Sequence, residues 1–201
     1  PLVERGQREE VKERLDATGA VLTSLDEKSL AAAVARGRRH RVESVAVCLL
    51  HAYANPVHER RIERYLKKHL PGVAVSLSCD VAAEIREYER MSTTSANAYV
   101  MPLMERYLNE LSARLERAKI RAPLRVMTSS GGFTSSKTAA RQPILLLESG
   151  PAGGVLSAVN TARQAGTQDL LALDMGGTTA KACVAVGGEA DVAHSFEVAR
   201  V

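Results

Sequence analysis

Near its C-terminal end the chain reads Leu170-Leu-Ala-Leu-Asp174-Met-Gly176-Gly177-Thr178-Thr179-Ala-Lys181-Ala-Cys-Val-Ala-Val186. An apolar run reaches an aspartate, turns through two glycines and two threonines, and resumes with alternating apolar residues. This pattern predicts a β-hairpin. Glycines let backbone N–H groups approach an anion closely, and threonine hydroxyls add further donors. We therefore expect the bend of this hairpin to bind phosphate through Gly176, Gly177, Thr178 and Thr179.

Two charged residues of the same stretch extend this prediction. A carboxylate at the end of the first strand would repel phosphate unless hydrated Mg²⁺ lay between them, so Asp174 predicts a metal–nucleotide ligand and a role in orienting the metal-bound water. Lys181 follows on the second strand, two residues after Thr179. It has two interpretations, a phosphate contact or a solvated residue at the edge of the sheet.

Composition excludes several classes of function. The 201 residues are 25% charged and 45% hydrophobic with a net charge of +4, enough for one domain or two small lobes. Arg and Glu alternate in Glu59-Arg-Arg-Ile-Glu-Arg64, which predicts a solvated mixed-charge helix. With 3% aromatic residues and no Trp, we expect no nucleic-acid partner. No apolar run approaches the ~20 residues of a membrane span, so we expect no membrane partner.

The cysteines and histidines predict no metal site of their own. Cys48, Cys79 and Cys183 are far apart, each within an apolar run, which is typical of reduced thiols in a cytoplasmic protein. The five histidines show no spacing typical of zinc ligands.

Alternating strand and helix patterns predict an α/β fold. The expected strands cover residues 42–50, 73–78 and 124–128, and a third strand after the hairpin begins at Glu189. The first of these strands is apolar without interruption from Val45 to Leu50, which favours the interior of a parallel sheet. The expected helices cover residues 24–38, 55–70, 81–90, 99–118 and 150–165, with a break or cap at 92–95. Apolar residues recur at helical spacing in the fourth helix and predict a core face: Leu103, Tyr107, Leu108, Leu111 and Leu115.

Two further segments contain glycines next to an expected strand or helix. Gly131–Thr138 ends in Lys-Thr like a P-loop, but Ser136 stands where that loop requires glycine, so a polar turn is preferred. Ser129 and Ser130 before it form a plain turn or line a cleft. The segment 150–154 lacks the dinucleotide-binding spacing. Its small residues either allow close helix packing or let the helix N-terminus approach a ligand, so the candidate nucleotide contacts include Gly150, Gly153 and Gly154.

The order of the small-residue helix and the Asp174 hairpin along the chain resembles that of a known superfamily. A small-residue helix, followed about 20 residues later by a strand ending in Asp-x-Gly-Gly-Thr, resembles the first connecting helix and second phosphate loop of actin-like ATPases. A longer resemblance, to the A subunit of the hydantoinase/oxoprolinase family, covers essentially the whole chain. Its motifs are Ala46–His51, Tyr53–Pro56 with His58–Arg60, Glu84–Arg90, Ser92–Thr94, Asn97–Val100, Ser149–Gly154 and Asp174–Lys181.

This resemblance implies a partial actin-like, ribonuclease H-like fold. Residues 1–165 would form most of the first lobe with its connecting helix, and residues 166–201 the opening hairpin of the second. The family's first phosphate loop is not found in Pro1–Leu15, and its adenosine-binding segment would lie beyond Val201. The sequence thus resembles a central fragment, expected to be inactive alone and to belong to an oligomeric enzyme.

The family hydrolyses cyclic amides such as hydantoins and 5-oxoproline with ATP and Mg²⁺, usually with a B-type subunit. ATP would phosphorylate the ring amide oxygen before water opens the ring. Related subunits serve ATP-dependent ketone carboxylases, and a sugar kinase of the same superfamily is a further alternative, although no segment clearly supplies its catalytic aspartate.

Chaperone relatives carry a carboxylate where this chain has Gly150, and the nearby Glu148 is the candidate for activating water. Residues 87–90 could reach the cleft, but a surface helix with ion pairs is the default.

Overall fold

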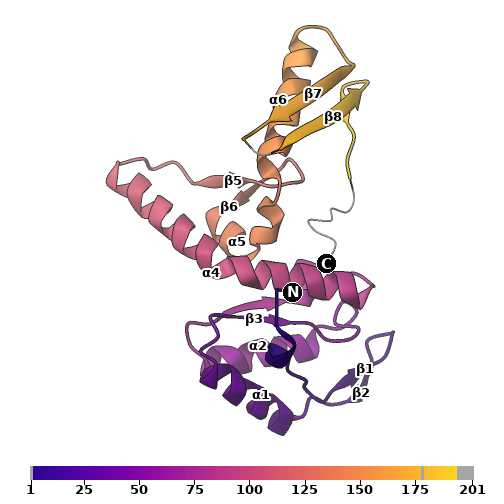
Figure 1. The fold of residues 1–201 in the computed structure, drawn as a ribbon, viewed down its shortest axis with the longest axis vertical. Helices are drawn as coiled ribbons and strands as arrows, with labels where there is room; N and C mark the ends of the chain where they lie inside the picture. Colours follow the sequence, from indigo (N-terminus) through magenta and orange to yellow (C-terminus); the bar gives the residue numbers. More distant parts are fainter. Residues whose placement is uncertain (1, 178, 194–201) are drawn as a thin grey trace. The chain divides into compact units, whose positions relative to one another are not determined.

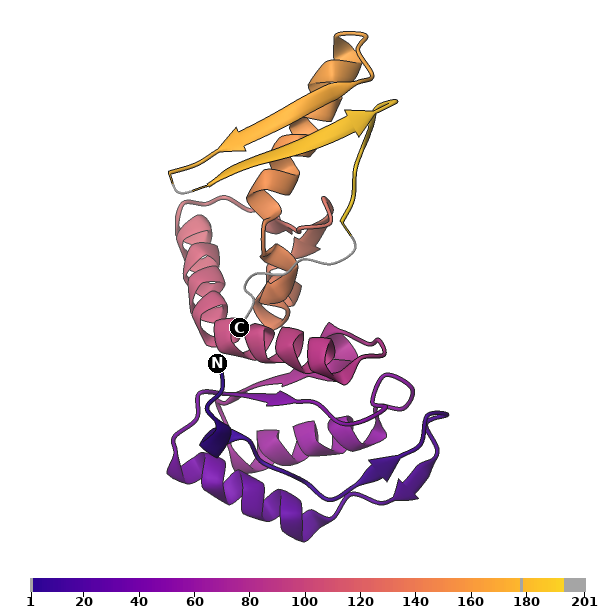
Figure 2. The ribbon, with the colours of Figure 1, turned by 45° about the vertical axis from the view of Figure 1, so that its right-hand side comes forward.

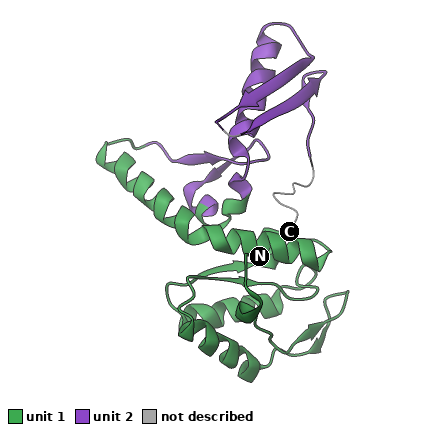
Figure 3. Cartoon of the chain, viewed as in Figure 1, with its two compact units in different colours: residues 1–121, 140–144 green, residues 122–139, 145–201 purple. Residues whose placement is uncertain are grey.

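The computed structural model of the chain describes residues 2–177 and 179–193 (Figure 1). The chain divides into two compact units (Figure 3). Unit 1 comprises residues up to 121 together with 140–144, and unit 2 comprises 122–139 and the residues from 145 onward. The predicted division into lobes at residues 165/166 refers to a longer fold and stays a prediction.

Unit 1 is built on a two-stranded parallel sheet. Strands β3 (Ser44–Val47) and β4 (Ala74–Leu77) pair in register from Ser44↔Ala74 to Val47↔Leu77. The parallel pairing is as predicted, but among the described residues β3 has one neighbouring strand and is not interior to the sheet. Both strands are also shorter than expected. Helices α1 (Glu27–Arg39) and α2 (Val57–His69) cover one face, and α4 (Glu87–Arg117) covers the other (Figures 1 and 2).

The pleat of this sheet separates an apolar face from a partly polar one. Side chains on the α1/α2 face form the core of unit 1 with residues from both helices: Leu25, Leu30, Val34, Val47, Ile62, Leu66, Leu70 and Leu77. On the α4 face, Ser76 Oγ accepts a hydrogen bond from Asn97 Nδ2 at 3.0 Å. The remaining elements of unit 1 are short: a 3₁₀ turn η1 (Arg5–Gln7), the antiparallel pair β1 (Arg14–Leu15) and β2 (Val21–Thr23), and α3 (Ser78–Val81).

Local side chains set the beginnings of the first two long helices. Asp26 Oδ1 accepts hydrogen bonds from the backbone N–H groups of Lys28 and Ser29, so Asp26 caps α1. The prediction that Ser24 begins this helix is therefore wrong by two residues. Asn55 Oδ1 accepts from the N–H of Val57, the first residue of α2. Pro56 is the N-cap, so the helix begins two residues after the predicted residue 55.

Helix α4 runs without interruption for 31 residues, so the predicted break at Ser92–Ser95 is wrong. The hydroxyls of Thr93 and Thr94 donate to the carbonyls of Glu89 and Arg90, which satisfies them inside the helix instead of ending it. The helix contains Pro102 and is bent (Figure 2), as expected where proline removes a backbone donor.

The predicted core stripe of α4 is correct only in part. Leu108 is buried, whereas Leu103 and Tyr107 are more than half exposed. In the part of the chain that the structure describes, no helix is long and apolar enough to cross a membrane.

Unit 2 contains two antiparallel sheets. Strands β5 (Arg125–Met127) and β6 (Phe133–Ser135) form a hairpin whose turn places Gly131 at φ +82°. The segment with P-loop-like residues becomes β6 and the first turn of α5 (Ser136–Arg141), after which η2 (Pro143–Leu146) follows. Helices α5 and η2 each contribute residues to both units.

The second sheet of unit 2 holds the predicted hairpin. Strands β7 (Leu170–Met175), β8 (Ala180–Val186) and β9 (Glu189–Ala190) form an antiparallel meander, and α6 (Ser149–Gln164) packs against it (Figure 1). The hairpin, the helix and the third strand are all confirmed. Together with the parallel sheet of unit 1, this arrangement confirms the mixed α/β class.

Candidate phosphate-binding site

The bend between β7 and β8 is a short exposed loop. Asp174 pairs with Lys181 across the hairpin, and the N–H of Gly176 donates to the carbonyl of Thr179 at 2.9 Å. Asp174, Gly176, Gly177 and Thr179 are exposed, so their polar groups are accessible to a ligand. Thr178, also a predicted contact, lies outside the described residues.

A residue 33 positions earlier in the sequence joins this hairpin. Glu148 immediately precedes α6 in a left-handed conformation (φ +62°), and its carboxylate forms an ion pair with the ammonium group of Lys181. Both side chains remain about one-third exposed. Because Lys181 also lies opposite Asp174 in the register, the structure brings together the three charged residues that the sequence singled out separately.

The three glycines of α6 differ in their surroundings. A Cβ built on Gly153 would lie 2.6 Å from Met127 Sδ, whereas Gly150 and Gly154 have nothing within 4 Å. Close packing of α6 on β5 therefore explains Gly153. The other two glycines face open space.

The residues present fit Mg²⁺ only as a metal that arrives with phosphate. Among the described residues there is no group of three His, Cys, Asp or Glu side chains that could hold an ion. Mg²⁺ is usually bound through one or two carboxylates, with substrate phosphates and water completing its ligands. Asp174, exposed at the loop, can supply one such carboxylate.

A polar cluster in unit 1 was not predicted, and it centres on Glu59. This side chain is completely buried in α2, and its carboxylate accepts from the backbone N–H of Leu49, the hydroxyl of Ser78 and the backbone N–H of Cys79 at 2.6–2.9 Å. It thereby connects the residues that follow β3 and β4. The prediction that Glu59-Arg-Arg-Ile-Glu-Arg64 is a solvated face is wrong for Glu59, and charge pattern alone gave no signal of its burial.

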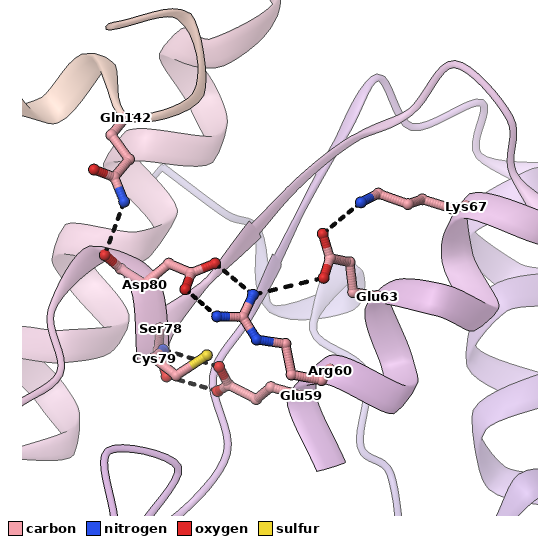
Figure 4. Close-up of polar contacts among 8 residues, drawn as sticks. All are labelled: Glu59, Arg60, Glu63, Lys67, Ser78, Cys79, Asp80 and Gln142. Atoms are coloured by element: carbon pink, nitrogen blue, oxygen red, sulfur yellow. Dashed lines mark hydrogen bonds and ion pairs between the residues drawn. The ribbon is translucent and has the colours of Figure 1, made fainter. Parts of the chain in front are cut away.

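Further polar contacts lie next to this cluster (Figure 4). Arg60 pairs with Asp80 and with Glu63, Lys67 pairs with Glu63, and Gln142 Nε2 donates to the carbonyl of Asp80.

The Asp80 carboxylate raises the pKa of the Arg60 guanidinium above its ordinary value. Burial, with the neighbouring Glu59 carboxylate, raises the pKa of the Cys79 thiol to about 12. Burial also raises the pKa of Cys48. Both thiols are therefore protonated at neutral pH, as expected of structural cysteines.

Arg90 also departs from the predicted surface helix. Its side chain is 1% exposed, Nη2 donates to the carbonyl of Leu49 at 2.7 Å, and the guanidinium lies 5.4 Å from the centre of the Tyr53 ring. Glu87, Tyr88 and Glu89 are exposed, as the default interpretation expects. The arginine therefore fastens the loop after β3 to the first turn of α4.

Two family models together match most of the chain. The family model "Hydantoinase/oxoprolinase" matches residues 90–201, and the model of the N-terminal region of the same family matches residues 1–70. The chain belongs to the hydantoinase/oxoprolinase family. The resemblance stated from the sequence motifs is thus confirmed.

Individual relatives match nearly the whole chain. An uncharacterised protein of Methanocaldococcus jannaschii is 36% identical over 98% of the chain, and the caprolactamase subunit alpha of Pseudomonas jessenii is 31% identical over 99%. In each case the match covers 29% of the relative's own length. The chain therefore spans less than a third of these curated relatives.

Two solved structures are similar to the chain in three dimensions. Nucleotide-free acetone carboxylase, described in a study of ATP-dependent acetone carboxylation, matches with a TM-score of 0.77 at 28% identity, over 89% of this chain and 26% of that one. The ATP-dependent caprolactamase of Pseudomonas jessenii matches with a TM-score of 0.75 at 29% identity, over 87% and 25%.

Proposed function

We propose that this chain is part of the nucleotide-binding A-type subunit of an ATP-dependent cyclic amide hydrolase, acting with a B-type subunit. The observation that carries the proposal is the exposed β7–β8 loop with Asp174 and Lys181 opposite each other. The similarity to caprolactamase, named for a cyclic amide and described as ATP-dependent, supports the choice of reaction.

Each residue of the loop has a distinct task in this proposal. The backbone N–H groups of Gly177 and Thr179 would bind phosphate oxygens, since glycine allows close approach of the main chain. Asp174 would hold Mg²⁺ and its water, and the ammonium group of Lys181 would offset negative charge on the transferred group. Fixed donors of this kind supply most of the stabilisation in phosphoryl transfer. ATP, when bound, would supply the phosphoryl group that activates the amide oxygen.

Binding of Mg²⁺-ATP tests the proposal directly. In the full-length protein we expect Asp174→Asn to weaken Mg²⁺-ATP binding by about tenfold or more, because the neutral amide is a poor ligand for a hard cation. Isothermal titration calorimetry measures this affinity, and Asp191→Asn, at an exposed position beyond β9, is the matched control. Equal affinities for the two variants would remove Asp174 from the metal site.

The alternative function, that of a carboxylase subunit, is supported by the match to acetone carboxylase. Its TM-score of 0.77 is close to the 0.75 of caprolactamase. The two reactions can be distinguished by which substrate stimulates ATP consumption. ATP consumption that depends on hydantoin, 5-oxoproline or caprolactam supports the hydrolase, whereas consumption that depends on a ketone with bicarbonate supports the carboxylase.

A further inference from the structure

The ion pair between Glu148 and Lys181 places a carboxylate on the lysine of the proposed phosphate loop. Glu148 lies at the position before α6, where a side chain commonly accepts from the first N–H groups of the helix, yet its carboxylate makes no such cap. It bonds Lys181 instead. The Glu148 carboxylate therefore connects the start of α6 to strand β8 and takes no part in capping the helix.

The negative charge near Lys181 affects how a phosphate group can bind. Asp174 lies opposite Lys181 in the strand register, and Glu148 forms an ion pair with the Lys181 ammonium group, so the three side chains together carry a net charge of −1. A phosphate group entering the loop would meet this negative charge, and Mg²⁺ at Asp174 would offset only part of it. Lys181 has three N–H donors, but the Glu148 carboxylate draws the ammonium group toward itself and repels an entering phosphate, so the two anions compete for Lys181.

We infer that Glu148 is a positioning residue that holds Lys181 in the nucleotide-free loop and is exchanged for a phosphate oxygen when nucleotide binds. This inference rests on the proposed function. It replaces the prediction that Glu148 activates water, because the carboxylate is bonded to Lys181 in this structure. Both side chains are one-third exposed, which leaves room for the exchange.

The inference predicts opposite signs for two substitutions. Glu148→Gln removes the competing negative charge and should tighten Mg²⁺-ATP binding by about fivefold, the scale of a partly exposed ion pair. Lys181→Met removes the phosphate donor and should weaken binding by about tenfold. Glu148→Asp keeps the charge and should restore an affinity close to that of the unchanged protein.

Calorimetric titration of the full-length protein with Mg²⁺-ATP, in these variants and in the double variant, makes the test. The gain from Glu148→Gln should vanish when Lys181 is already Met, because the two residues act through one contact. Glu189→Gln, an exposed charge removal on β9 of the same sheet, controls for net charge. An equal gain in that control, or a gain that survives in the double variant, would contradict the inference.

Weaker binding in Glu148→Gln would overturn the inference in favour of a direct role in holding the metal or water. If the unchanged protein binds no Mg²⁺-ATP at all, the proposed function fails instead. The two failures are thus distinguishable, since the inference is judged only by the variants of a protein that binds.

Discussion

Glu59 and Cys79 are adjacent at the end of the parallel sheet, and each affects the ionisation of its surroundings. The Glu59 carboxylate accepts hydrogen bonds from three donors, including the N–H of Cys79. The same negative charge, added to burial, opposes formation of the Cys79 thiolate. Cysteine reactivity at this site is therefore set by tertiary contacts and not by the local sequence.

The alkylation rate of Cys79 should report this directly. With a folded-state pKa of about 12, against about 8.5 for an unperturbed thiol, Cys79 should react with iodoacetamide at pH 8 more than tenfold more slowly than in the urea-unfolded chain. Peptide mass spectrometry of timed samples measures both rates. Similar rates in the two states would mean that the carboxylate and burial do not protect the thiol.

The same pKa carries a stability consequence with a definite sign. Because the folded-state value lies above that of the unfolded chain, the protonated thiol contributes its full stability below about pH 8.5, and this contribution is lost as pH rises toward 12. The free energy of unfolding of unit 1 should fall over that range, and Cys79→Ala should reduce the slope.

At the scale of elements, Asn97 shows how α4 is fixed to its surroundings. This buried amide donates to Ser76 Oγ and the carbonyl of Arg141, and its oxygen accepts from the N–H of Ile144. One side chain thus connects a strand, a helix and the segment 140–144 within unit 1. Its position in a run of small polar residues explains why the sequence suggested a helix break nearby.

Helix α6 offers a matched pair of glycines. Gly153→Ala would press a methyl group on Met127, whereas Gly154→Ala meets nothing within 4 Å and gains helix propensity. We expect Gly154→Ala to stabilise unit 2 by about 0.5–1 kcal/mol. We expect Gly153→Ala to cancel that gain or cost about 1 kcal/mol, because flexible methionine can move only partly aside.

Urea unfolding of the two variants separates packing from ligand binding. Equal stabilities would show that Met127 moves aside without cost. If Gly154→Ala leaves stability intact yet weakens Mg²⁺-ATP binding, its open surroundings belong to the nucleotide site.

At the scale of the whole molecule, one face of the β7–β8–β9 sheet is apolar and uncovered by the described residues. Its side chains are each more than half exposed: Leu171, Leu173, Met175, Val184 and Val186. The opposite face packs on α6 through residues such as Ala185 and Val159. A contiguous apolar face of this kind is typical of an interaction surface or an aggregation site.

We expect this face to cause self-association of the 201-residue chain. Leu173→Lys places a charge at its centre and should shift the sedimentation profile toward monomer in analytical ultracentrifugation. Gln164→Lys, an exposed change at the end of α6, adds the same charge elsewhere. An equal shift in both variants would attribute the effect to net charge alone.

The sequence by itself determined the elements whose signals are local. The apolar run, the glycine turn and the alternating strand of residues 170–186 specify a hairpin through short-range backbone preferences, and Asn55-Pro56 specifies the start of a helix. The motifs also determined the family. These features could be predicted because the interacting residues lie within a few positions of one another.

Only the tertiary structure decided which charged residues are buried and which meet. Glu59 and Arg90 look like ordinary surface charges in the sequence, yet one connects the ends of two strands and the other fastens a loop. Glu148 reaches Lys181 across 33 positions because α6 packs against the hairpin. Burial and ion pairing depend on how distant elements pack, and no periodic or local pattern in the chain encodes that packing.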